Sequence, residues 1–177
     1  MNILVVDDQP EFLIPFFPRL EGAGITIQVL RDLGDAWLEI AAGARFDLVV
    51  IHIAFDSPAS EFQAEQSLSR ESLVQRGYGG LAVSGQALGI RILRERQVRQ
   101  TPYSYTTNHQ NLWIENIPSH DPEFAGGLPT EHDTIIDKAQ LWLGNVVDKL
   151  QAAQQEWARS KRLSRTGQDH SGAASHG

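Results

Sequence analysis

Residues 2–8, with the sequence NILVVDD, decide the fold of this chain, because four consecutive apolar residues end in two carboxylates. A short apolar run bounded by polar residues is typical of a strand buried on both faces, as in a parallel sheet. Residues 46–53, FDLVVIHI, form a second such run. We expect these strands to be neighbours, with Asp7, Asp8 and His52 at the carboxyl edge of the sheet, where open α/β sheets bind their ligands.

The rest of the chain alternates between strand and helix patterns, which predicts an α/β fold. Pro15 and Pro18 interrupt the first helical segment, so we expect a kinked or shortened helix there. Apolar periodicity predicts further strands at 25–30 and 103–107, and helices at 34–43, 85–99 and 133–160.

The chain has three segments that we expect to differ from a regular α/β domain: an insertion, a helix extension and a tail. Residues 56–84 form a long insertion after the third strand, which we expect to be a partly ordered flap over the acidic site. The last helix is expected to extend past a domain of residues 1–150, as an extension over 151–163. The tail, 164–177, is rich in Ser, Gly, His and Ala, and we expect it to be disordered.

The composition excludes several classes of function. The chain has 177 residues, enough for one domain with a sizeable core, and a net charge of −7, which disfavours general binding to nucleic acid. It has no cysteine, so disulfides, thiolate metal sites and cysteine nucleophiles are excluded. No apolar run approaches a membrane span, and we find no signal peptide. We therefore expect a cytoplasmic protein that does not contact membranes.

The acidic pair and the spacing around the third strand carry a family resemblance. The chain resembles the receiver domain of two-component response regulators, in which paired acids after the first strand hold Mg²⁺. In that family an Asp, four apolar residues and an acceptor Asp define the third strand. Here Asp47 opens the pattern and His52 stands at the acceptor position. The resemblance implies a three-layer, doubly wound, flavodoxin-like fold with a five-stranded parallel sheet of order 2-1-3-4-5.

Two other positions of the family pattern also matter. A Ser or Thr at the end of the fourth strand contacts the phosphoryl group in receivers, and Thr106 or Thr107 resembles it. A Lys follows the fifth strand in receivers. We expect that strand at 124–130, where Leu128 or Thr130 would replace the Lys, and none of the three lysines of the chain (Lys138, Lys149 and Lys161) fits. The resemblance is therefore to a degenerate receiver.

The chemistry of the acidic edge leaves several interpretations open. His52 cannot form an acyl phosphate, and its charged form could pair with Asp7 or Asp8 in place of a metal ion. A core histidine without a role is the alternative. Asp56, four residues further on, is an alternative acceptor. The adjacent carboxylates Asp7 and Asp8 allow weak Mg²⁺ binding, although a solvated acidic pair is equally consistent with the sequence.

Other side chains bear on partners. Trp142 is expected in the core or at an interface, and Trp157 at a protein contact on the helix extension, unless that helix packs back on the domain. Homodimerisation through the last helix is consistent with the resemblance. The arginines of the third helix, Arg91 and Arg94 among them, are expected on a solvated face.

Three functions follow as hypotheses. The leading one is a non-enzymatic, phosphorylation-independent pseudo-receiver that binds a signalling protein and requires no cofactor. The second is an unusual active receiver phosphorylated at Asp56, with Mg²⁺ bound by Asp7 and Asp8. The third is a small-molecule or nucleotide sensor at the carboxyl end of the sheet.

Overall fold

The computed structural model describes residues 1–55, 60–67, 84–95, 100–107, 135–143 and 145–169. Its centre is a parallel sheet with the order β2-β1-β3-β4-β5, as the resemblance implied. The short apolar runs form the inner strands, because each is covered on both faces. The strands are β1 (Asn2–Val6), β2 (Thr26–Leu30), β3 (Leu48–His52), β4 (Tyr103–Thr107) and β5 (Ile135–Asp137).

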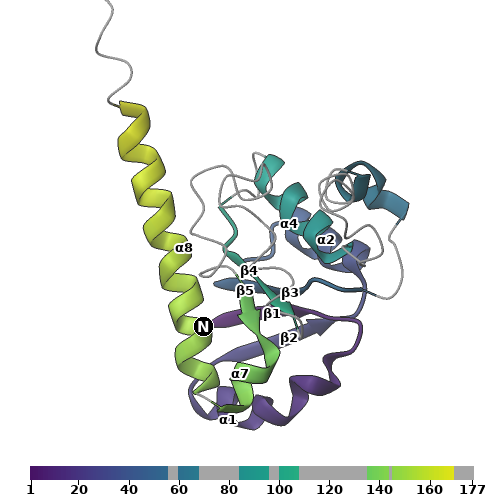
Figure 1. Ribbon diagram of the computed structural model, residues 1–177, viewed down its shortest axis with the longest axis vertical. Coiled ribbons are helices and arrows are strands. Elements are labelled where there is room, and N and C mark those ends of the chain that lie inside the picture. Colours follow the sequence, from purple (N-terminus) through teal and green to yellow (C-terminus); the bar gives the residue numbers. More distant parts are fainter. Residues whose placement is uncertain (56–59, 68–83, 96–99, 108–134, 144, 170–177) are drawn as a thin grey trace, which may run out of the picture.

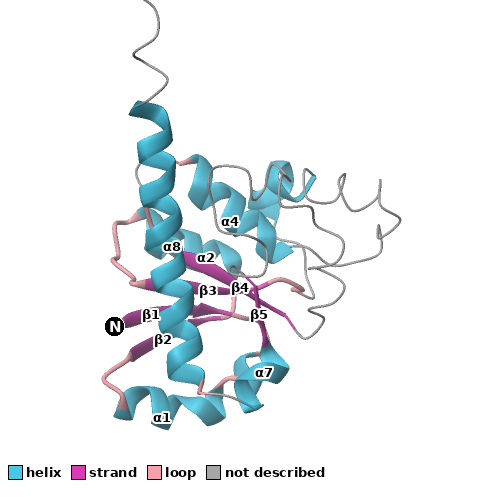
Figure 2. Cartoon of the chain, turned by 60° about the vertical axis from the view of Figure 1, so that its left-hand side comes forward, coloured by secondary structure: helices cyan, strands magenta, loops and turns pink. Residues whose placement is uncertain are grey.

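Helices cover both faces of the sheet, so the three-layer, doubly wound prediction is confirmed. On one face α2 (Leu33–Ala41) and α4 (Ser84–Arg94) pack against the strands, and on the other α1 (Phe17–Gly22), α7 (Lys138–Leu143) and the start of α8 (Val146–Asp169) do so (Figures 1 and 2). Alternate residues of β1 belong to two separate cores: Leu4 and Val6 to the first, Ile3 and Val5 to the second.

The prolines shape the first helical segment as expected. Two 3₁₀ turns, Pro10–Phe12 and Ile14–Phe16, precede α1, which has only six residues. Each of these three pieces has a proline in its first turn, where the missing N–H costs nothing. The segment therefore leaves the Asp7 and Asp8 end of the sheet as three short helical pieces, which pack on one face of the sheet through Leu13, Phe16 and Leu20.

The C-terminal elements differ from the sequence-based expectation. Residues 135–137, expected at the start of a long helix, form β5 instead, while 124–130 lie outside the described residues. The long helix α8 continues to Asp169, so residues 164–169, expected in a disordered tail, are helical. Pairing with β4 decides that residues 135–137 form a strand, since the intrinsic propensities of so short a segment favour neither helix nor strand strongly.

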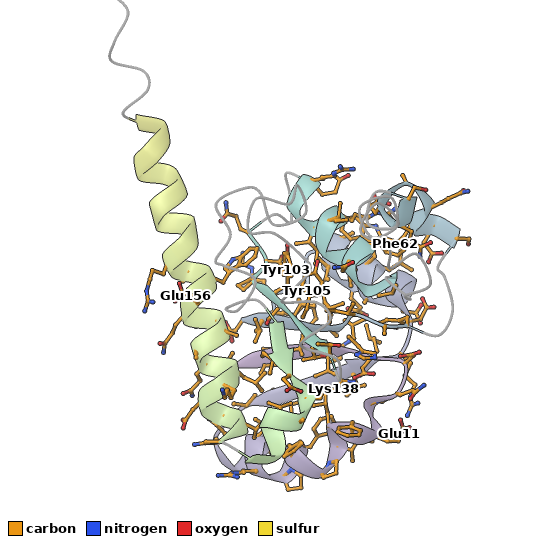
Figure 3. All side chains as sticks on the ribbon, in the orientation of Figure 1. Glu11, Phe62, Tyr103, Tyr105, Lys138 and Glu156 are labelled. Atoms are coloured by element: carbon orange, nitrogen blue, oxygen red, sulfur yellow. The ribbon has the colours of Figure 1, made fainter. Side chains whose placement is uncertain are left out.

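Trp157 packs in the core, so the alternative of a helix that packs back on the domain holds, and the predicted protein contact at an exposed Trp157 is wrong. Its side chain is 3% exposed, and its ring lies 4.8 Å from that of Tyr103 (centroid to centroid). Figure 3 shows Tyr103 on the side of β4 that faces α8. The helix reaches both cores, because Leu150 and Ala153 pack on the face of α1. The side chain of Trp142 is outside the described residues.

The described part of the insertion packs against helices. Ser60–Phe62 form a 3₁₀ turn and residues 63–67 are helical. Phe62 is fully buried in the core that α2 and α4 share. This part of the expected flap is thus a component of the α2/α4 layer.

Candidate functional site

A buried ion pair joins the ends of the first and last strands. Asp7 follows β1 and Lys138 directly follows β5, and both residues are at most 1% exposed. The Lys138 ammonium donates to Oδ2 of Asp7 at 2.7 Å (Figure 3 labels Lys138). The other carboxylate oxygen of Asp7 accepts the backbone N–H of Gln9 at 3.0 Å. The charge of Asp7 is therefore balanced inside the protein.

The expectation that the chain lacks the receiver Lys is wrong. Lys138 stands at the carboxyl end of β5, which is where the family pattern places that residue. The error came from placing the fifth strand at 124–130. The signal in the sequence was present but short: the two β-branched residues Ile135 and Ile136, followed by Asp137 and Lys138.

His52 is the last residue of β3 and is 7% exposed. Its Nδ1 lies 3.2 Å from the backbone oxygen of Thr106. Because a carbonyl oxygen only accepts, we assign the ring proton to Nδ1. Burial lowers the pKa of His52 and the Lys138 ammonium lowers it further; the opposing effects of the Asp7 and Asp8 carboxylates and the Thr106 carbonyl are smaller. The neutral ring is favoured, and the cation beside Asp7 is Lys138 instead of the charged His52 considered above.

The register of β4 separates the two candidate threonines. Thr106 is the direct partner of His52, so the two side chains lie on the same face of the sheet. Thr107 is also buried, but it follows in the strand and points to the opposite face. The hydroxyl of Thr106 is buried and has no hydrogen-bond partner among the described residues. Thr106 is therefore the residue at the site.

Gly85 allows α4 to begin directly against the end of β3. Its N–H donates to the backbone oxygen of Ile53 at 3.1 Å. A Cβ at this position would lie 1.9 Å from the backbone oxygen of His52, a distance that no side chain tolerates. The absence of a side chain thus permits the start of α4 to approach the backbone of His52 closely.

Asp7, Asp8 and His52 form a group of potential metal ligands. One ligand atom from each lies within 4.8 Å of the others. The receiver resemblance implies Mg²⁺ here, but the donors do not fit that ion well. Mg²⁺ requires oxygen ligands in near-ideal octahedral geometry, whereas a ring nitrogen replaces the third carboxylate and Lys138 engages Asp7. Asp56, the alternative acceptor, lies outside the described residues.

A hollow lies at the other end of the sheet. It has a volume of about 580 Å³ and lies between the amino ends of β3 and β4 and the side of α8, where Asp47, Pro102 and Gln154 line it. The sensor hypothesis placed its ligand at the carboxyl end instead.

In the part of the chain that the structure describes, no helix is long and apolar enough to cross a membrane.

Comparison with solved structures identifies the fold. A sensor protein from Polaromonas sp. JS666 matches with a TM-score of 0.54 at 13% identity, over 88% of this chain and 97% of that one. NtrX from Brucella abortus matches with a TM-score of 0.54 at 21% identity, over 95% of this chain but only 29% of that one. The N-terminal domain of a response regulator receiver protein from Methanoculleus marisnigri JR1 is less similar, with a TM-score of 0.49 at 19% identity, over 80% and 90% of the two chains, so the fold assignment rests on the first two structures and on the strand order.

This chain has a receiver-like fold. The strand order and the positions of Asp7, His52, Thr106 and Lys138 at the strand ends agree with that topology. No family model and no curated protein matches the sequence. Because every reported identity is below 25%, the similarity concerns the fold, and function has to be argued from the site.

Proposed function

We propose that the chain is a phosphorylation-independent, receiver-like signalling module that acts by binding another protein. The observation that carries this proposal is His52 at the carboxyl end of β3, in register with Thr106. This is the position of the acceptor Asp in receivers. An imidazole has no carboxylate, so it cannot form the acyl phosphate on which the switch of a receiver depends.

The Lys138–Asp7 pair supports the same proposal. In a receiver the Lys reads the charge of the phosphoryl group, whereas here its ammonium already has a buried carboxylate at 2.7 Å. With a neutral His52, the charges of Asp7, Asp8 and Lys138 sum to −1. The site thus has a stable arrangement without a phosphoryl group, as a module that stays in one state requires.

In this proposal the chain is not an enzyme, requires no cofactor and works in the cytoplasm. Its contacts are with a signalling protein, or with a second copy through α8, which extends past the sheet (Figure 1). Nucleic acid is not proposed as a partner, because the net charge of −7 repels phosphate. Since Trp157 is buried, exposed residues of α8 such as Gln151 and Gln155 would form any such contact.

The test is incubation of the full chain with Mg²⁺ and acetyl phosphate, followed at once by intact mass spectrometry at neutral pH. We expect no gain in mass. A gain of one phosphoryl group would overturn the proposal, and His52→Asn and Asp56→Asn variants would then show which residue carries it. An authentic receiver treated in parallel verifies that the reagent is active.

The His52→Asp variant is the matched control. It restores the acceptor carboxylate and leaves Asp7, Thr106 and Lys138 in place. We expect this variant to gain one phosphoryl group, and we expect hydroxylamine to remove it, because hydroxylamine cleaves acyl phosphates. That result would show that the missing acceptor alone blocks phosphorylation of the natural chain.

An active receiver remains the second candidate, because Asp7, Thr106 and Lys138 occupy the positions that a phosphoryl group needs. In that case Asp56 would be the acceptor and Asp7 and Asp8 would hold Mg²⁺. A mass gain that the Asp56→Asn variant abolishes would identify this function. The two candidates thus predict opposite outcomes for the natural chain.

A further inference from the structure

The replacement of the acceptor carboxylate by His52 changes the chemistry of the acidic edge. Among the residues that the structure describes, Asp7, Asp8 and His52 form the group of three His, Asp or Glu side chains whose ligand atoms lie within 4.8 Å of one another. Asp7 and His52 are buried and Asp8 is partly exposed, so an ion has access from the side of Asp8. The group is thus a site at the carboxyl end of the sheet with two hard oxygen donors and one imidazole.

The orientation of His52 is that of a histidine prepared to bind a metal ion. Its Nδ1–H donates to the backbone oxygen of Thr106, so Nε2 carries the lone pair of the neutral ring. Histidine ligands almost always donate their second ring N–H to a carbonyl, a carboxylate or water, which fixes the ring. The contact with Thr106 therefore provides, without any ion, the outer hydrogen bond that such a ligand needs.

A second observation comes from the hydroxyl of Thr106. It is buried and has no hydrogen-bond partner among the described residues, although buried hydroxyls usually have one. Because Thr106 is in register with His52, this hydroxyl lies on the face of the sheet that carries the ring of His52. A water molecule bound to an ion at Asp7, Asp8 and His52 would supply the missing partner.

The donor set selects the class of ion. Mg²⁺ takes oxygen ligands and retains its waters, whereas imidazole suits Zn²⁺, Ni²⁺, Cu²⁺ and iron. We propose that Asp7, Asp8 and His52 bind a divalent transition-metal ion of the Zn²⁺ class, in place of the Mg²⁺ that receivers bind. This inference does not depend on the proposed function, because it concerns which ion binds and makes no use of phosphorylation.

Lys138 sets the strength of this site. The ion has to share Asp7 with the ammonium at 2.7 Å or displace it, and both arrangements reduce the affinity. Carboxylates and imidazole together still favour Zn²⁺ over Mg²⁺, since the nitrogen ligand contributes to the first ion and not to the second. We therefore expect clear selectivity with moderate affinity.

The test is calorimetric titration of the full chain with Zn²⁺, Co²⁺ and Mg²⁺ at one pH, together with the visible absorption spectrum of the Co²⁺ form. We expect one Zn²⁺ per chain at this site and an affinity for Zn²⁺ at least tenfold above that for Mg²⁺. The His52→Asn variant should lose at least tenfold in Zn²⁺ affinity and the Co²⁺ bands should change. The Asp8→Asn variant, at a partly exposed position, gives a second readout if His52→Asn fails to fold.

His52→Asp is the discriminating control. With three carboxylates, this variant should bind Mg²⁺ more tightly and Zn²⁺ more weakly than the natural chain. Equal Zn²⁺ affinity in the natural chain and both His52 variants would overturn the inference, because His52 would then not be a ligand of the ion. Zn²⁺ binding no tighter than Mg²⁺ binding in the natural chain would also overturn it.

Discussion

Two ion pairs in this molecule have almost the same length but different surroundings. The Lys138–Asp7 pair is 2.7 Å long, with side chains 2% and 1% exposed. The Arg91–Glu65 pair is 2.8 Å long, with side chains 17% and 11% exposed. The first joins residues 131 positions apart at the ends of β5 and β1, and the second joins α4 to the insertion across 26 positions.

The difference shows how burial determines what an ion pair does. Removing one partner of a fully buried pair leaves a charge without solvent or partner, which is strongly destabilising. Arg91 and Glu65 are partly exposed to solvent, and Arg91 has more than one contact. It donates to both carboxylate oxygens of Glu65, and its guanidinium lies 3.9 Å from the centre of the Phe62 ring. The first pair therefore neutralises a buried carboxylate between the ends of β1 and β5, and the second holds the insertion against α4.

The largest effect is expected from Lys138→Met, which keeps the length of the side chain and removes its charge. Asp7 would remain buried and charged, so we expect a loss of roughly 3–5 kcal/mol in the free energy of unfolding. Urea denaturation followed by circular dichroism measures it. A variant as stable as the natural chain would show that water reaches Asp7.

The double variant Asp7→Asn, Lys138→Met is the control for this pair. It removes both charges, so most of the lost stability should return. If the double variant were as unstable as Lys138→Met, packing of the Lys138 side chain, and not its charge, would account for the loss.

A smaller effect is expected from Arg91→Ala, roughly 2–3 kcal/mol, because the hydrogen bonds to Glu65 and the contacts with Phe62 and Trp37 are lost together. Hydrogen exchange should accelerate in residues 60–67 while β1 and β3 stay protected. Arg91→Lys keeps the charge but not the planar fork, so its effect should be intermediate. Uniform acceleration across the sheet would mean that Arg91 supports the whole core.

The smallest effect is expected from Glu65→Gln, about 1 kcal/mol at neutral pH. Burial raises the pKa of Glu65, but the hydrogen bond from Arg91, a backbone hydrogen bond and the charges of Arg91 and Arg94 together outweigh it, so the pKa is lowered overall. The carboxylate form is thus favoured by folding, and its contribution is present above the unfolded pKa of about 4.3 and lost as the pH falls through the lower folded value. Thermal melts from pH 7 to pH 3 should converge for the two proteins at the acidic end.

The sequence indicated most of the sheet and half of the site. The apolar runs ending in Asp7, Asp8 and His52 located β1 and β3, since continuous apolar runs have few alternatives to a buried parallel strand. Thr106 was one of two candidates, and only the register with His52 separates it from Thr107. Arg91, expected on a solvated face, contacts Glu65, because that partner comes from an insertion whose path the sequence does not specify.

Local sequence determined the acidic edge, the place of His52 at the end of β3 and the broken first helix, because each depends on neighbouring residues: an apolar run, a fixed spacing and the geometry of proline. Tertiary structure decided that Ile135–Asp137 is a strand, for which the sequence carries only a short signal, that Lys138 reaches Asp7, and that Trp157 is buried against Tyr103. These features join residues far apart in the chain. Their stability comes from burial and pairing in the folded protein, which no local pattern of residues contains.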